Sequence, residues 1–146
     1  MSVLRPALAT SSVHPPAVRA GDVALRGVIV GLTLATGYIH LTLGGALFTL
    51  NAVGYAAGAV ALVVPIGIAI RYRSVVRLGL IGYAASTIVG WWLWGPRYDI
   101  AYVAKAIELA LIALLSIDLV RHDGSPRRVL GEVLHDLRSA IAALAR

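Results

Sequence analysis

The feature that most constrains this chain is a run of 44 residues, 27–70, that contains no Asp, Glu, Lys or Arg. A helix needs about 20 residues to cross the ~30 Å hydrocarbon core of a bilayer. The run is therefore long enough for two membrane-spanning helices, and the pair Gly44-Gly45 is suited to a tight turn between them. We expect these two helices over 22–43 and 46–70.

Two more apolar segments follow the first pair. We expect helices over 77–95 and 100–120, because each stretch is long enough to span a bilayer and Gly95-Pro96 separates them. Pro65 is expected to bend the second helix near its end. All three tryptophans of the chain fall at the end of the third segment, as in an interfacial aromatic belt: Trp91, Trp92 and Trp94.

The composition of the 146-residue chain agrees with a membrane protein. Hydrophobic residues make up 59% of it and charged residues only 14%, whereas a soluble domain is about 25% charged. The mean hydropathy of +0.83 comes from long apolar runs rather than from an even spread. The sequence therefore predicts an all-α membrane protein, a four-transmembrane-helix bundle over 22–121.

The two ends of the chain differ from this bundle. Residues 1–21 are rich in proline and polar residues, and we expect a flexible cytoplasmic arm. In 122–146, apolar residues recur at helical spacing and charged residues occupy the other side. This pattern predicts a C-terminal amphipathic interfacial helix on the cytoplasmic side, lying along the membrane surface or against a protein partner.

The basic residues predict an orientation. With four spans, eleven arginines fall on the side of the two termini, whereas only Arg97 falls on the other side and Lys105 lies just inside the fourth helix. Loops rich in Lys and Arg stay in the cytoplasm. We therefore expect a multi-pass protein of a bacterial-type inner or plasma membrane with cytoplasmic N and C termini. The same distribution explains the net charge of +6 without nucleic acid as a partner.

Small residues at four-residue spacing indicate where helices approach closely, because such residues form the interfaces of membrane helices. The set comprises Gly27, Gly31, Gly54, Gly58, Gly82, Ser86 and Gly90. Two interpretations stay open. These residues pack the helices of one bundle together, or one ridge, above all that of the third helix, faces another subunit.

A few polar residues lie inside the apolar segments, at similar depth in the half of the bundle away from the termini. They are His40, Asn51, Tyr102, Lys105 and Glu108. Charges in a bilayer are costly, at about 2.5–3.5 kcal/mol for one central charge, and the spacing of Lys105 and Glu108 allows them to pair. One interpretation is a cavity that binds a ligand, an ion or a proton. The other is structural: Lys105 extends toward the interface and Asn51 joins helices.

Several chemistries are excluded or unsupported. The chain has no cysteine, which excludes thiolate metal sites and disulfides. His14, His122 and His135 belong to the cytoplasmic side, so His40 has no histidine partner for a haem, and no haem or metal site is supported by this chain alone. No catalytic motif is present, and we do not expect an enzyme.

The segments 40–55 and 102–115 resemble small uncharacterised bacterial four-helix membrane proteins. The resemblance covers about a quarter of the chain and rests on His40, Phe48, Leu50, Asn51, Gly54, Lys105 and Glu108. It implies a four-helix membrane fold and carries no known activity.

Two functions are compatible with these features. The first is an accessory or scaffolding subunit of a larger membrane complex, an electron-transfer complex being one candidate; its partners would be membrane lipid and other subunits or itself. The alternative is a small membrane binding or transport protein with a polar cavity in the outer half of the bundle. The alternative requires His40, Asn51, Lys105 and Glu108 to line one connected cavity.

Overall fold

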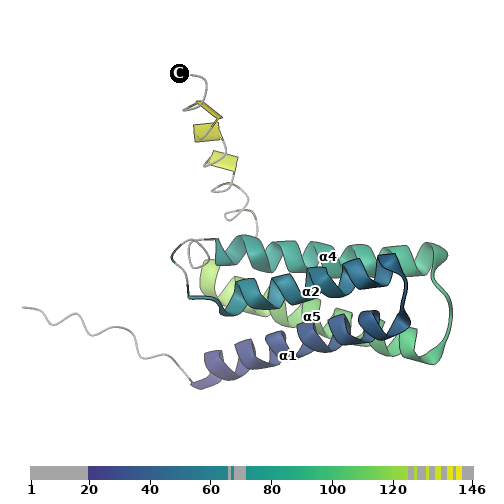
Figure 1. The fold of residues 1–146 in the computed structure, drawn as a ribbon. Helices are drawn as coiled ribbons and strands as arrows, with labels where there is room; N and C mark the ends of the chain where they lie inside the picture. The colour runs from purple at the N-terminus through teal and green to yellow at the C-terminus, as the bar shows by residue number, and fades with distance from the viewer. Residues whose placement is uncertain are drawn as a thin grey trace, which may run out of the picture.

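The computed structural model describes residues 20–65, 67 and 72–124, followed by the isolated positions 127, 131, 134–135, 138–139 and 141–142. Within this part the chain forms four helices and no strand: α1 (Ala20–Leu43), α2 (Ala46–Val63), α4 (Arg73–Trp94) and α5 (Asp99–Asp123). They lie side by side as an up-and-down bundle (Figure 1). The predicted all-α four-helix bundle is confirmed.

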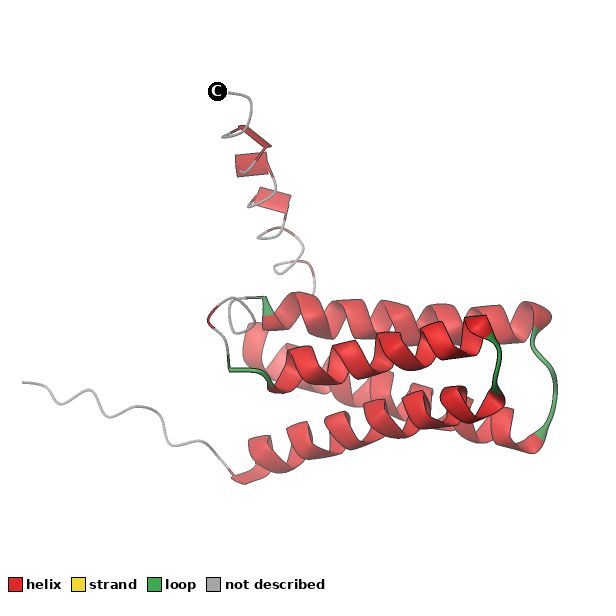
Figure 2. Ribbon diagram, viewed as in Figure 1, coloured by secondary structure: helices red, strands yellow, loops and turns green. Residues whose placement is uncertain are grey.

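The helices form a ring in which each packs against its neighbours in the order α1, α2, α4, α5, with α5 closing against α1. The pair α2 and α4 makes the sparsest contact. At one end, α1 turns into α2 through Gly44 and Gly45, whose φ angles of 72° and 87° lie in the left-handed region that glycine tolerates. The α4–α5 loop lies at the same end (Figure 2). We call this the turn end and the opposite one the terminal end.

Two helix bounds differ from the expected ones by four residues or more. α2 ends at Val63 rather than at residue 70, because Val64 precedes Pro65 and is extended, at φ −62° and ψ 123°. Pro65 therefore lies just after the end of α2, and residue 67 is again helical. Residues 66 and 68–71 lie outside the described part of the chain, so the bend expected at Pro65 stays a prediction. α4 begins at Arg73, four residues before the expected start, since Arg73 and the three residues after it are part of the helix. The expected arm lies almost wholly outside the described residues, and so does most of the C-terminal amphipathic helix.

All four helices are long and apolar enough to cross a membrane. The core is small and formed by residues from every helix: Ile29, Tyr55, Leu80, Ala84, Leu111 and Leu115. Most other large apolar side chains point outward, including Leu34, Leu50 and Leu109, each more than half exposed. An apolar exterior of this kind suits lipid contact and fits a multi-pass membrane protein.

The small residues serve different purposes. Gly54 and Gly58 of α2 allow α4 to approach closely, because a Cβ at either position would collide with the side chain of Tyr83 or Leu80. Gly27 and Gly31 of α1, and Gly82 of α4, have no such neighbour within 4 Å among the described atoms. Packing within the bundle therefore accounts for the pair on α2 but not for the others.

We predict that Gly54→Ala lowers the free energy of unfolding by about 1–3 kcal/mol, the usual cost of an overpacked contact. Tyr83 would have to move, and its hydroxyl would lose its hydrogen bonds to Asn51. The matched control is Gly82→Ala, which meets open space and should be neutral or slightly stabilising. Reversible unfolding in mixed micelles, followed by circular dichroism, measures both. Equal effects of the two substitutions would contradict this packing.

Candidate binding site

A buried carboxylate lies at the centre of the site. Glu108 of α5 is fully buried, and Lys105, one turn earlier, donates a hydrogen bond from Nζ to Oε2 over 2.6 Å. The i, i+3 spacing on one helix face makes this pairing possible. Each charge compensates the other, so that neither is isolated in an apolar surrounding.

Two side chains of α1 approach the same carboxylate. Thr36 donates a hydrogen bond from Oγ1 to Oε1 of Glu108 over 3.3 Å, and Nε2 of His40 lies 3.6 Å from that oxygen. The Nδ1 of His40 lies 2.8 Å from the carbonyl oxygen of Thr36. A carbonyl can only accept, so Nδ1 is the donor in this contact. We call Thr36, His40, Lys105 and Glu108 the polar cluster.

Asn51 of α2 lies beside the cluster and is held by α4. The Tyr83 hydroxyl donates to Oδ1 of Asn51 over 3.1 Å and lies 3.3 Å from its carbonyl oxygen. This contact leaves the amide hydrogens of Asn51 as donors. Between Asn51 and the cluster lies Tyr55, whose ring centre is 5.6 Å from that of His40 and 5.0 Å from that of Tyr83.

A cavity of about 360 Å³ at the turn end brings these groups together. His40, Asn51 and Lys105 line it, whereas Glu108 lies below them and is not in its wall. Its remaining surface is largely apolar and aromatic, contributed by Leu47, Phe48, Trp91, Trp94 and Tyr98 among others. Ser86 and Gly90 also line the cavity, so these two small residues of α4 leave room for it.

Trp91 is fixed as one wall of the cavity. Its indole Nε1 donates to the carbonyl oxygen of Pro96 over 2.8 Å, and the Arg97 guanidinium lies 4.4 Å from its ring centre. Tyr102 meets the same ring edge-on, with ring centres 5.1 Å apart. Tyr102 itself is 52% exposed and lies outside the cavity. It therefore supports Trp91 rather than joining the polar cluster.

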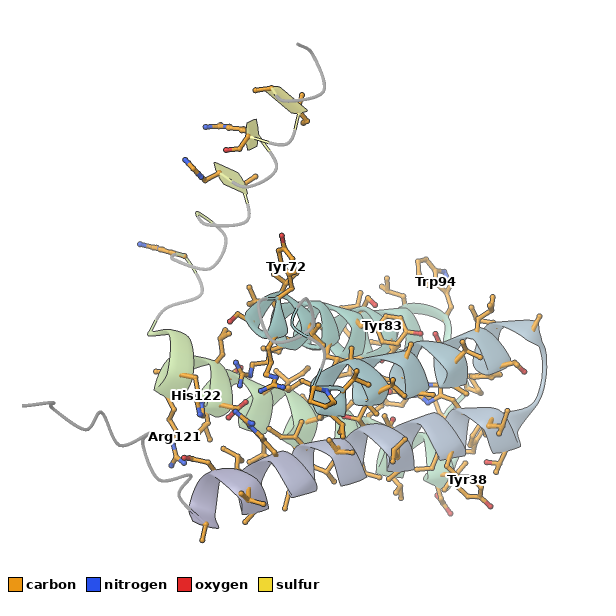
Figure 3. The ribbon with its side chains drawn as sticks, turned by 60° about the vertical axis from the view of Figure 1, so that its left-hand side comes forward. Tyr38, Tyr72, Tyr83, Trp94, Arg121 and His122 are labelled. Carbon is orange, nitrogen blue, oxygen red and sulfur yellow. The ribbon has the colours of Figure 1, made fainter. Side chains whose placement is uncertain are left out.

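The other two tryptophans lie mostly at the surface. Trp92 is 67% exposed and Trp94 is 83% exposed, and Figure 3 shows Trp94 directed away from the bundle. Both positions suit the predicted aromatic belt, and Trp94 also borders the cavity mouth.

The structure brings together most of the site residues predicted from the sequence. His40 and Lys105 both contact Glu108, and Asn51 lines the same cavity as His40 and Lys105. Tyr102 lies outside that cavity.

Sequence reasoning missed Thr36, Tyr55 and Tyr83. One signal was available for Thr36, because it lies one turn before His40 on α1 and faces the same way. The contacts of the two tyrosines depend on how α2 and α4 pack together. No spacing within a single helix reveals them.

A second buried ion pair lies at the terminal end. Arg77 of α4 donates from Nε to Oδ2 of Asp118 on α5 over 2.6 Å, and both side chains are about 3% exposed. His122 Nδ1 lies 3.2 Å from the other carboxylate oxygen. The sequence had suggested no role for Asp118. Asp118 and Glu108 are the two buried carboxylates among the described residues.

Lys105 and Asn51 supply hydrogen-bond donors to the cavity at the turn end. Lys105 has three N–H groups, of which one is directed at Glu108, and Asn51 presents its amide hydrogens. Among the described residues no group of three or more His, Cys, Asp or Glu is placed to hold a metal ion. Comparison with family models, curated proteins and solved structures finds no match to this chain.

Proposed function

We propose that this chain is a small integral membrane protein that binds a small amphipathic molecule in the cavity at the turn end. The observation that carries the proposal is the convergence of His40, Asn51 and Lys105, from three helices, on one cavity of about 360 Å³ with aromatic walls. Ligand sites are typically largely apolar cavities of about 300–1,000 Å³ with a few placed polar groups. The proposed action is binding, without a catalytic step.

The donors of the cavity indicate the chemistry of the ligand. Lys105 and Asn51 favour a group that accepts hydrogen bonds, such as a ring carbonyl or a carboxylate. The rings of Phe48 and Trp91 favour a flat or aliphatic body next to that group. Glu108 acts from below by holding the Lys105 ammonium in place.

The proposed orientation follows the arginines. Arg26, Arg73, Arg77 and Arg121 belong to the terminal end and Arg97 to the turn end. By the positive-inside rule both termini are cytoplasmic. The ligand then enters from the outer side of the membrane. We take this to be a bacterial-type inner membrane because the proteins that the sequence resembles are bacterial.

The test fills the cavity from within. Gly90 lines it and has no side-chain neighbour within 4 Å among the described atoms, so Gly90→Leu places four carbons in the space of the ligand. Gly82→Leu adds the same atoms two turns away, outside the cavity. The probes are a short-chain benzoquinone and decanoate, titrated against tryptophan fluorescence in detergent.

We expect saturable binding of at least one probe by the wild type and by Gly82→Leu, and a loss of roughly tenfold or more in affinity in Gly90→Leu. Trp91 lines the cavity, so its emission should report occupation. Binding that survives unchanged in Gly90→Leu, or no saturable binding in any variant, would count against the proposal.

A second candidate function is that of an accessory subunit of a larger membrane complex. Small residues on the outer surface of the bundle favour this function. Gly27 and Gly31 on α1, and Gly79 and Gly82 on α4, are exposed without close neighbours among the described atoms. Such surfaces let another membrane helix approach. This candidate predicts that Gly82→Leu releases the chain from a large assembly in gently solubilised native membranes. Recovery of only small particles from wild-type membranes would argue against it.

A further inference from the structure

A second cavity, of about 370 Å³, opens at the terminal end, far from the site described above. Three arginines from two helices line it: Arg26 of α1, and Arg73 and Arg77 of α4. The one acidic residue among its described lining residues is Asp118. Three guanidinium groups against one carboxylate give this lining an excess of two positive charges.

The ion pair uses only part of this charge. Arg77 donates from Nε to Oδ2 of Asp118 over 2.6 Å. The other oxygen, Oδ1, is buried without a hydrogen-bond partner among the described residues and lies 3.2 Å from Nδ1 of His122. The Nε atoms of Arg26 and Arg73 are buried and have no hydrogen-bond partner among the described residues. A buried charged donor without an acceptor is costly, and bringing like charges together adds to that cost. The excess positive charge and the two unpartnered Nε donors therefore favour a further anion in this cavity.

The depth of the arginines suits a phosphate at the edge of the membrane. Arg26 is six residues from the start of α1, roughly 9 Å along the axis, and Arg77 is four residues from the start of α4, roughly 6 Å. With the bundle centred on a hydrocarbon core of about 30 Å, both arginines would lie near the edge of that core. The other walls are apolar, from Val23, Ile29, Val30, Leu62 and Val63.

We propose that this cavity binds a phosphate group through Arg26 and Arg73, with Arg77 held in position by Asp118. Guanidinium groups match phosphate oxygens in pairs of parallel hydrogen bonds. Basic pockets between membrane helices on the cytoplasmic side are suited to anionic headgroups. The phosphate belongs either to an anionic lipid or to a soluble phosphorylated compound.

Two measurements distinguish these sources. Native mass spectrometry of the detergent-solubilised full chain compares how much phosphatidylglycerol and how much phosphatidylcholine the protein retains. Calorimetric titration of the delipidated protein follows inorganic phosphate and glycerol 3-phosphate. Selective retention of phosphatidylglycerol alone identifies a lipid site, and binding of the soluble phosphates identifies a site for a soluble compound. Binding of none of these probes overturns the proposal.

The variants are Arg26→Gln and Arg73→Gln, with Arg121→Gln as the matched control. Arg121 is exposed near the end of α5, at the same end of the bundle but outside the cavity (Figure 3). Each cavity variant should weaken binding by about tenfold, the loss of one charge-assisted hydrogen bond, and the control should bind like the wild type. An equal loss in all three variants would reveal only general attraction to positive charge and overturn the proposal. If one cavity variant does not fold, the other carries the comparison.

Discussion

Glu108→Gln is expected to lower the free energy of unfolding by about 3–5 kcal/mol, the usual cost of removing one partner from a buried ion pair. The substitution keeps the shape of the side chain but leaves Lys105 without the carboxylate that it contacts over 2.6 Å. It also removes the negative charge that faces His40. Unfolding in mixed micelles at neutral pH measures the change.

Two variants separate the ion pair from packing in general. Lys105→Met/Glu108→Leu replaces both charges by apolar groups and should recover most of the lost stability, because no charge is then left unpaired. Asp99→Asn removes an exposed carboxylate at the start of the same helix and should cost at most about 1 kcal/mol. A Glu108→Gln protein as stable as Asp99→Asn would show that Lys105 does not depend on Glu108.

Asp118→Asn should have an effect of similar size at the other end of the bundle. Arg77 is about 3% exposed and loses the carboxylate that its Nε contacts over 2.6 Å. We expect a loss of about 3–5 kcal/mol in unfolding free energy, measured in detergent without phosphate or anionic lipid, since a bound anion would offset part of it.

The double variant Arg77→Leu/Asp118→Leu and the single variant Arg121→Gln complete this comparison. The double variant should be clearly more stable than Asp118→Asn, because it removes both buried charges. Arg121→Gln removes an exposed charge one turn away and should change stability by less than about 1 kcal/mol. A double variant less stable than Asp118→Asn would mean that the pair contributes stability beyond mutual compensation.

The helices were predictable because the bilayer imposes a length and a polarity on each span. Hydropathy alone gave the positions of α1 and α5 within three residues. Hydropathy placed the start of α4 four residues too late, because the charge of Arg73 favours a loop. Arg77, at the edge of the expected span, is buried in the bundle because Asp118 on α5 pairs with it.

The polar cluster was predictable in part, from depth. His40, Lys105 and Glu108 lie at matching depths on α1 and α5, and this depth alone predicted that they belong to one site. Tyr102 lies apart from the cluster because of its direction on α5. It precedes Glu108 by six residues, and at about 100° per residue the two side chains point about 120° apart. The tyrosine therefore faces Trp91 on the outside, while the glutamate faces the centre.

The cavity itself was beyond sequence reasoning. It exists because α2 and α4 contact one another sparsely and because Ser86 and Gly90 carry little side chain toward the gap. The same small residues had suggested a ridge for close packing. Whether a small residue admits a helix or leaves a hollow depends on the neighbouring helix, which its own segment does not specify.

The measurement that tests binding at the turn end most directly is native mass spectrometry of the chain extracted in mild detergent from its own membranes. Wild type and Gly82→Leu should retain a small amphipathic molecule that Gly90→Leu, whose new side chain fills the cavity, has lost. Any adduct lost only in Arg26→Gln or Arg73→Gln would belong to the other cavity. A wild-type protein with no such molecule, or one that Gly90→Leu retains equally, would contradict a ligand site among His40, Asn51 and Lys105.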